Sequence, residues 1–153
     1  KPFFLVGSDY VFPRTSHAIT KRQLKTLGGS VVGEEYLPLG DTNVSSIVAR
    51  IKDSMSGGGV IINHFNGDQN IAFFRALYRS GVTPENGFYV MSYTILEGEI
   101  SLIGPDFLDG HYGAWNYVMS DPSRLHLASL WLHLKSDMDR IFLFLIPMNR
   151  HTI

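Results

Sequence analysis

The 153-residue sequence contains no cysteine, which excludes disulfide bonds, thiolate metal sites and a cysteine nucleophile. It also has little excess charge, since 13 Lys and Arg residues face 14 Asp and Glu residues, and it has no basic stretch. Nucleic-acid binding is therefore not expected, because neutralising phosphates requires clustered Lys and Arg. The longest apolar run, residues 141–147, is too short to span a bilayer.

Recognisable catalytic and cofactor motifs are lacking as well. The six histidines show no HExxH or other metal-ligand spacing, and only His126 and His133 are placed to share a helix face. Glycines 57–59 precede an apolar run, whereas phosphate- and dinucleotide-binding loops follow a strand. Ser8 does not lie in a G-x-S-x-G elbow. We therefore expect a protein that is not an enzyme and that needs no cofactor or metal.

Short apolar runs are what the sequence does contain. They predict five strands, at residues 3–6, 31–37, 60–62, 88–91 and 111–115. Their starts recur at roughly the spacing of βα units. Continuous rather than alternating apolar strands are typical of a parallel sheet that is covered on both faces. The sequence therefore predicts an α/β fold with a doubly wound parallel sheet.

Helices are expected between these strands, because apolar residues there recur at helical spacing. A short helix is expected at residues 96–103. Side chains able to cap a helix N-terminus precede the other three helices: Thr15 or Ser16, Thr42 or Asn43, and Asp68.

The last part of the chain has a different character. Asp121-Pro122 is a good helix start, and a very apolar helix is expected over residues 125–134. A strand-like run follows at residues 141–146. We expect residues 1–121 to form one α/β lobe and residues 122–153 to form a divergent helix and strand. This divergent part either completes the lobe or forms an interface.

Polar and aromatic residues gather where the predicted strands end. Residues 7–13, 63–68 and 92–94 follow three strands, and Glu97 lies just beyond the last. Ligands of open α/β sheets bind outside the carboxyl ends of the strands. Aromatic walls with amides and hydroxyls suit a small, neutral, polar solute. This interpretation requires Tyr10, His64 and Ser92 to lie on one side of the sheet.

Each of these features also has a structural interpretation. Asp68 is more simply a helix cap than a general base, and Asn66-Gly67 is a common turn dipeptide. Tyr10 and Phe12 can be loop aromatics that pack on the sheet edge. Ser92 and Thr94 can be hydroxyls that satisfy backbone groups of loops.

Two segments carry a family resemblance. Residues 3–14 (FFLVGSDYVFPR) and 110–117 (GHYGAWNY) resemble the second lobe of urea- and short-amide-binding proteins of ABC importers, a group that includes the amide-sensing regulator of aliphatic amidase expression. Weaker matches follow the same order at residues 33–40, 45–48, 66–68, 72–74 and 90–92. The resemblance extends from residue 1 to about residue 122.

The resemblance implies one lobe of a type I periplasmic-binding-protein fold. It also implies a ligand site made of Tyr10, Phe12, His64, Phe65, Asn66, Gly67, Ser92, Thr94 and Glu97. The sequence departs from the family at two of these positions. Phe12 stands where the family often has Tyr, and His64 where it often has Thr. The first lobe and the usual C-terminal pattern are absent, so we expect a truncated protein with millimolar affinity or none.

Three functions are consistent with the sequence. The first is the ligand-binding lobe of a urea or short-amide receptor, which is extracytoplasmic and meets the membrane only through an ABC permease. The second is a structural or interaction fragment that dimerises through the exposed inter-lobe face or the apolar tail. The third is the lobe of a cytoplasmic amide sensor.

Overall fold

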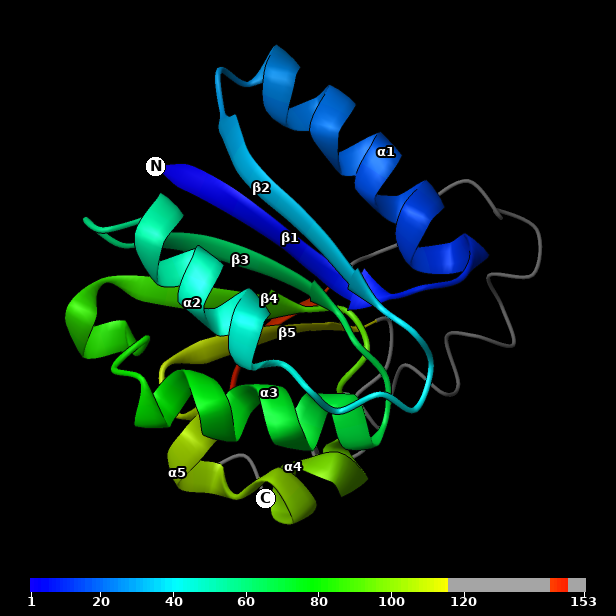
Figure 1. The fold of residues 1–153 in the computed structure, drawn as a ribbon, viewed down its shortest axis with the longest axis vertical. Coiled ribbons are helices and arrows are strands. Elements are labelled where there is room, and N and C mark those ends of the chain that lie inside the picture. Colours follow the sequence, from blue (N-terminus) through cyan, green and yellow to red (C-terminus); the bar gives the residue numbers. More distant parts are fainter. Residues whose placement is uncertain (116–143, 149–153) are drawn as a thin grey trace, which may run out of the picture.

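The computed structural model describes residues 1–115 and 144–148, and a single six-stranded sheet organises them (Figure 1). The strand order is β2-β1-β3-β4-β5-β6. The first five strands are parallel and β6 pairs antiparallel with β5. The strands are β1 (Pro2–Ser8), β2 (Ser30–Leu37), β3 (Gly59–His64), β4 (Phe88–Ser92), β5 (His111–Trp115) and β6 (Phe144–Met148).

All five strands predicted from the first 115 residues are confirmed. Four of them extend by one to three residues past the expected bounds, because polar and small residues at the ends of the apolar runs still pair within the sheet. In β1, consecutive residues Phe4, Leu5 and Val6 are all fully buried. Both faces of the sheet are therefore covered at its centre, as the continuous apolar runs indicated. The doubly wound α/β fold is confirmed.

The helices divide between the two faces. Val6 belongs to the core that contains α2 (Ser45–Ser54) and α3 (Asp68–Arg79). The next residue, Gly7, faces α1 (Val11–Thr26), where an added Cβ would lie 2.7 Å from Pro13 Cβ. Because adjacent strand residues point to opposite faces, α1 lies on the face opposite α2 and α3. Gly7 thus permits a close approach of α1 that a larger residue would prevent.

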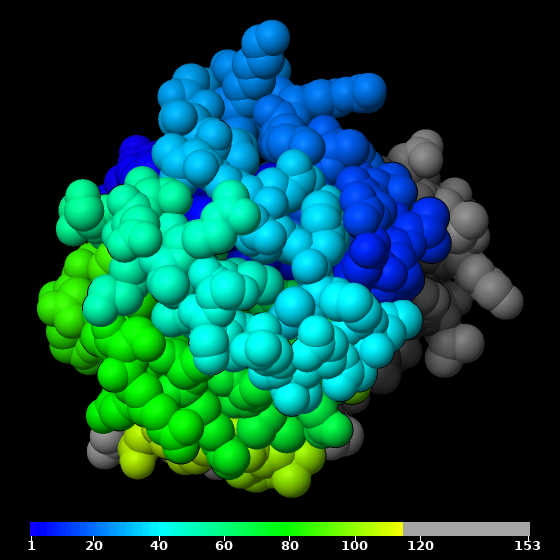
Figure 2. All heavy atoms as spheres, in the orientation of Figure 1, coloured from blue at the N-terminus to red at the C-terminus, as the bar shows by residue number. Residues whose placement is uncertain are grey.

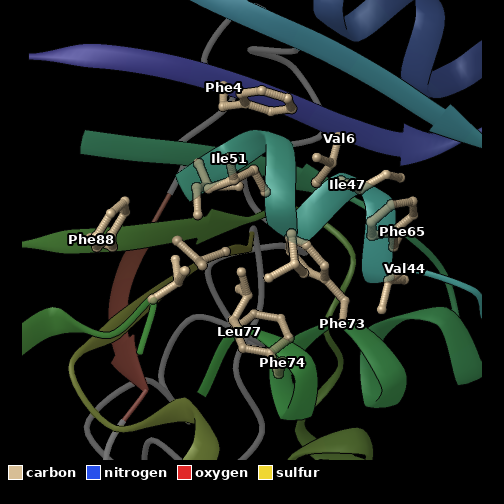
Figure 3. Packing of buried hydrophobic residues seen from close by; sticks show 14 of the residues in the cluster. Phe4, Val6, Val44, Ile47, Ile51, Phe65, Phe73, Phe74, Leu77 and Phe88 are labelled. Atoms are coloured by element: carbon tan, nitrogen blue, oxygen red, sulfur yellow. The ribbon is translucent and has the colours of Figure 1, made fainter. Parts of the chain in front are cut away.

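The main core lies between the sheet and α2 and α3. In Figure 3, Phe4 and Val6 of β1 point toward Ile47 and Ile51 of α2, and Phe73 and Leu77 of α3 fill the space below. Figure 2 shows the atoms of α2 and α3 side by side over this face of the sheet. The short helices η1 (Pro84–Asn86), α4 (Glu97–Ile103) and α5 (Pro105–Leu108) complete the layer.

All three predicted helix caps are wrong. Helix α1 begins at Val11 rather than after Thr15 or Ser16, with an extended Tyr10 as its N-cap. Pro13 favours this early start, because its fixed φ and missing N–H suit a first helical turn. The N-cap of α2 is Val44, and neither Thr42 nor Asn43 caps it.

Asp68 is not a cap either, because it is the first helical residue of α3 and Gly67 is the N-cap. A carboxylate in this first turn still opposes the positive end of the helix dipole. Gly67 has a φ of 55°, which a residue with a side chain adopts less readily. The Asn66-Gly67 turn therefore sets where α3 begins.

Two features extend the sequence prediction. Helix α5 was not predicted; its four residues follow Gly104, whose φ of 105° turns the chain after α4. Strand β6 falls at Phe144–Met148, later than the run at residues 141–146. The predicted helix at residues 125–134 lies outside the described residues, and the division of the chain near residue 121 stays a prediction. Among the helices described, none has the length and apolar character needed to cross a membrane.

The core predicts a contrast between two leucines. Leu77 of α3 is fully buried, whereas Leu102 of α4 is 61% exposed. We expect Leu77→Ala to lower the free energy of unfolding by about 2–5 kcal/mol, because it removes core contacts and leaves a cavity. Leu102→Ala should change it by less than about 1 kcal/mol. Urea unfolding of both variants measures the difference, and equal losses would contradict the proposed core.

Candidate ligand-binding site

The strand order has a topological switch point between the carboxyl ends of β1 and β3, and we refer to the sheet edge at this point as the crevice. The chain leaves β1 to form β2 on one side and then returns to form β3 on the other. Crevices at such switch points are where open α/β sheets bind ligands. The segment from Asp9 to Phe12 follows β1, and the segment from Phe65 to Gly67 follows β3. Both therefore border the crevice.

A layer of buried polar side chains supports this edge from the α3 side. Ser8, Asn63 and Ser92 end or nearly end three neighbouring strands, and all three are fully buried. Ser8 Oγ donates to Gln69 Oε1 over 2.5 Å. Asn63 Nδ2 donates to Asn70 Oδ1 over 2.8 Å and to Ser92 Oγ over 3.0 Å. The hydrogen bonds to Gln69 and Asn70 fix the strand ends to the first turn of α3.

Phe65 and Thr94 belong to the same supporting layer. Phe65 is fully buried and its ring packs edge-on against Phe73, with centroids 5.1 Å apart. Thr94 Oγ1 donates to the carbonyl oxygen of Phe65 over 2.5 Å. The Phe65 amide in turn donates to Asn63 Oδ1 over 3.0 Å. These contacts hold the loop after β3 in one conformation.

The α1 side of the edge carries a cluster of rings, which we call the aromatic wall: Tyr10, Phe12, His64 and Tyr93. The His64 ring stacks on Tyr93 with an interplanar angle of 3° and centroids 5.0 Å apart. Phe12 meets His64 edge-on at 5.5 Å and Tyr10 at 6.3 Å. Phe12 is 47% exposed although it belongs to this cluster. The wall thus presents apolar ring surface at the crevice.

Amide and hydroxyl groups lie beside the wall. Asn66 Nδ2 donates to the hydroxyl oxygen of Tyr10 over 3.3 Å and to Ser8 Oγ over 3.1 Å. Behind the wall, His64 contacts Ser16 and His17 of α1 through its two ring nitrogens. These groups can orient a polar solute that lies against the rings.

Two charged residues that follow β1, Asp9 and Arg14, form an ion pair. Arg14 Nε donates to Asp9 Oδ1 over 2.6 Å, and the Arg14 guanidinium lies 4.3 Å from the centre of the Tyr36 ring. The hydrogen bond from Arg14 lowers the pKa of Asp9. His64 of the wall and His17 behind it are mainly neutral at pH 7, because burial lowers the pKa of His17 and lowers that of His64 to about 3. Within the described residues, no group of three His, Asp or Glu side chains is arranged to hold a metal ion.

The structure places eight of the nine predicted site residues in two groups. Tyr10, Phe12, His64 and Asn66 come together on the α1 side, with Gly67 exposed next to them. The supporting layer on the α3 side contains Phe65, Ser92 and Thr94. Glu97 is the partly buried first residue of α4.

The expectation that Tyr10, His64 and Ser92 share one side of the sheet is therefore wrong for Ser92. The register pairs Asn63 with Ser92, so their side chains share a face and that of His64 points to the other. The residue that shares a face with His64 is Tyr93, which the sequence interpretation missed together with Ser16 and His17. The sequence within β4 offered no signal for Tyr93, because the pairing of β3 with β4 decides which residue joins His64.

The low pKa of His64 predicts how stability depends on pH. Its folded pKa of about 3 lies below the usual value of 6.5, so the unfolded state binds this proton first as the pH falls. The contribution is complete above about pH 6.5 and is lost progressively toward about pH 3. When the pH is lowered from about 7 to about 4.5, we expect the melting temperature of His64→Gln to fall less than that of the parent protein. Equal losses, or an NMR titration of His64 near pH 6.5, would contradict this assignment.

Comparisons with known proteins identify the family and the fold of the chain. The family model described as "Periplasmic binding protein domain" matches residues 1–126. A solute-binding protein of an ABC transporter from R. palustris, solved with 4-hydroxybenzoate, is 28% identical with a TM-score of 0.73. Another, from Rhodopseudomonas palustris HaA2 and solved with p-hydroxybenzoic acid, is 25% identical with a TM-score of 0.73. Both matches cover 86% of this chain and 36% of the solved chain.

A more distant structure shares the fold. It is a branched chain amino acid ABC transporter periplasmic ligand-binding protein from Burkholderia xenovorans LB400, with 20% identity and a TM-score of 0.69. That match covers 92% of this chain and 36% of the solved chain. The chain thus spans about a third of the length of these proteins and has the fold of one lobe of a type I periplasmic-binding protein. With a family model that matches residues 1–126, it belongs to the periplasmic binding protein domain family.

Proposed function

We propose that this chain supplies one ligand-binding lobe of a solute receptor for an ABC importer, and that its solute is a small planar organic molecule. The observation that carries the proposal is the aromatic wall at the β1/β3 switch point. Its Phe12 ring is 47% exposed and meets the ring of Tyr10, whose hydroxyl accepts a hydrogen bond from the Asn66 amide. Rings supply contact area to a planar solute, and the adjacent polar groups orient it.

Two solute classes fit such a wall. The sequence resemblance favours urea or a short amide, which is planar and rich in N–H donors. The two R. palustris proteins are solved with 4-hydroxybenzoate, which is planar and carries a phenolic O–H. In this chain the Arg14–Asp9 ion pair leaves little net charge beside the wall to attract a carboxylate. The proposal therefore rests on planarity and a hydrogen-bond donor, which the two classes share.

Exposed apolar side chains around the crevice fit a surface that closes over the solute. Val11 begins α1, Leu39 follows β2 and Leu96 precedes α4, and they are 76%, 61% and 56% exposed. All three positions follow the carboxyl end of a parallel strand. Covering them would remove apolar area from water and exclude water from the solute. We assign this surface to contact with another lobe in an extracytoplasmic receptor that delivers its solute to a membrane permease.

The same exposed surface favours a second function, which is self-association of the chain. Two copies that meet through Val11, Leu39 and Leu96 would bury similar apolar area without a solute. Light scattering separates the two functions. A stable dimer that forms without solute supports self-association, whereas a monomer supports the receptor lobe.

The wall predicts a loss of solute binding when Phe12 is truncated. We expect the 153-residue chain to bind 4-hydroxybenzoate, urea or acetamide with a dissociation constant of about 1 mM, because one lobe supplies only part of the contacts. Phe12→Ala should weaken binding at least about fivefold, since it removes an exposed ring from the wall. Calorimetry and ligand-observed NMR measure both constants.

Tyr78→Ala is the matched control for this experiment. Tyr78 is 50% exposed, similar to Phe12, but it lies in the last turn of α3, away from the switch point. Its replacement should leave solute binding unchanged. Binding that is insensitive to Phe12→Ala, or equally sensitive to both changes, would place the solute elsewhere.

A further inference from the structure

A continuous chain of hydrogen bonds runs behind the aromatic wall. It begins at Ser16, whose Oγ lies 2.8 Å from His64 Nε2. His64 Nδ1 lies 3.2 Å from His17 Nε2, and His17 Nδ1 lies 2.8 Å from the hydroxyl of Tyr36. The Tyr36 hydroxyl donates to Glu34 Oε1 over 2.5 Å. The chain thus links α1 and the end of β3 to the edge strand β2.

The carboxylate at the end of the chain fixes its direction. Hydrogen bonds from Lys21 and Tyr36 lower the pKa of Glu34, although partial burial acts in the opposite sense, so Glu34 is ionised and can only accept. Burial, followed by Glu34, raises the pKa of Tyr36, which therefore keeps its single proton and donates it to Glu34. The Tyr36 oxygen then has only lone pairs to offer His17.

The proton positions of the two histidines follow from the hydrogen bond that Tyr36 donates to Glu34. His17 Nδ1 must carry a proton to donate to Tyr36, and since His17 is neutral, its Nε2 is an acceptor. His64 must then donate from Nδ1 to His17, which leaves His64 Nε2 as an acceptor. Ser16 consequently donates its only hydroxyl proton to His64. One assignment therefore satisfies the hydrogen bonds among these five side chains, with both neutral histidines protonated at Nδ1.

Charged groups around the pair are consistent with this assignment. Glu34 Oε1 lies 3.5 Å from His17 Nδ1, which favours a proton on that nitrogen. Lys21 is bound to Glu34 Oε2, and Arg14 lies over the Tyr36 ring and pairs with Asp9. From the β4 side, Tyr93 meets His64 with its ring face. Burial disfavours a second proton on either His17 or His64.

We propose that Ser16 determines solute specificity. The hydrogen-bond chain uses the only proton of the Ser16 hydroxyl, so this hydroxyl offers only acceptor lone pairs to a solute in the crevice. Ser16 lies one helical turn after Phe12, touches His64 of the aromatic wall and is partly exposed. Among the described residues its Oγ has no other hydrogen-bond partner. The solute group that meets Ser16 is therefore an N–H or O–H donor. This inference rests on the proposed function and adds the polarity of one solute contact.

The tautomers of the histidines test the chain without any solute. Long-range proton–nitrogen NMR distinguishes Nδ1–H from Nε2–H imidazoles, and His64→Gln identifies the His64 signals. We expect both His17 and His64 in the Nδ1–H form at about pH 7.5, where the neutral forms dominate. An Nε2–H form of His64 would overturn the inference, whether or not the protein binds a solute.

Glu34→Gln should reverse the chain. Lys21 holds one side-chain oxygen of residue 34, so the amide oxygen of the variant stays with Lys21 and its NH₂ group faces Tyr36. Tyr36 would then donate to His17, and both histidines would change to the Nε2–H form. Glu35→Gln is the matched control, because Glu35 is adjacent in β2 but pairs with Arg50. Unchanged tautomers in Glu34→Gln, or changed ones in Glu35→Gln, would contradict the assigned direction.

Solute pairs test the consequence for specificity. 4-Hydroxybenzoate and 4-methoxybenzoate differ in one O–H donor, and urea and tetramethylurea differ in all their N–H donors. We expect the parent chain to prefer the donor of each pair at least about tenfold, because an acceptor facing an acceptor stays unpaired. Ser16→Ala should reduce this preference to about threefold or less. A preference that survives Ser16→Ala would overturn the role of Ser16. Absence of binding to all four solutes would contradict the proposed function, and the tautomers alone would then test the direction of the hydrogen-bond chain.

Discussion

Buried polar groups at the ends of the central strands are the constraint on which this edge of the protein depends. Ser8, Asn63 and Ser92 have no exposed surface, so water cannot satisfy their polar atoms. A buried donor or acceptor without a partner costs about 1–3 kcal/mol. Their partners include Gln69 and Asn70 in the first turn of α3. The position of α3 and the strand ends are therefore determined together.

The pleat of the strands places the supporting side chains and the aromatic wall on opposite faces of the same sheet edge. Asn63 and Ser92 point toward α3, whereas the next residues, His64 and Tyr93, stack on each other on the α1 side. A rigid supporting layer thus lies directly behind a surface made of rings. Because the loop from Phe65 to Gly67 is held by the first group, the Asn66 amide reaches Tyr10 without relying on a solute to order it. Such preorganisation reduces the entropy lost when a solute binds.

The sequence allowed a more complete prediction of the fold than of the candidate site. Continuous apolar runs such as Phe3–Val6 are sufficient to indicate buried parallel strands, and all five were found. Helix starts failed because the N-caps of α1, α2 and α3 are Tyr10, Val44 and Gly67, and none of these helices has a side-chain cap hydrogen bond. Hydroxyl and carboxylate side chains nearby were therefore misleading signals. Local composition placed the polar edge correctly but carried no information on these backbone geometries.

The site prediction was limited by register. A shift of one residue along a strand moves a side chain to the other face of the sheet. Ser92 and Tyr93 are adjacent, and only the pairing of Ser92 with Asn63 shows that Tyr93 is the residue that joins His64. That pairing is a long-range contact between β3 and β4, which periodicity within β4 alone does not specify. The same holds for Tyr36, whose importance comes from His17 on another element.

These contacts give the crevice polarity without giving it charge. An ionised residue beside the solute would favour ions of one sign and would require strong solvation. Here the carboxylate of Glu34 lies at the far end of the hydrogen-bond chain. The neutral side chains of His17 and His64 fix the donor-to-acceptor direction of the hydrogen bonds without adding charge. The charges of Arg14 and Asp9 offset each other in an ion pair. In the receptor lobe that we propose, a wall of rings with one oriented hydroxyl would select for the N–H or O–H donors of an uncharged planar group, and this selectivity would follow from the geometry of the hydrogen-bond chain rather than from net charge.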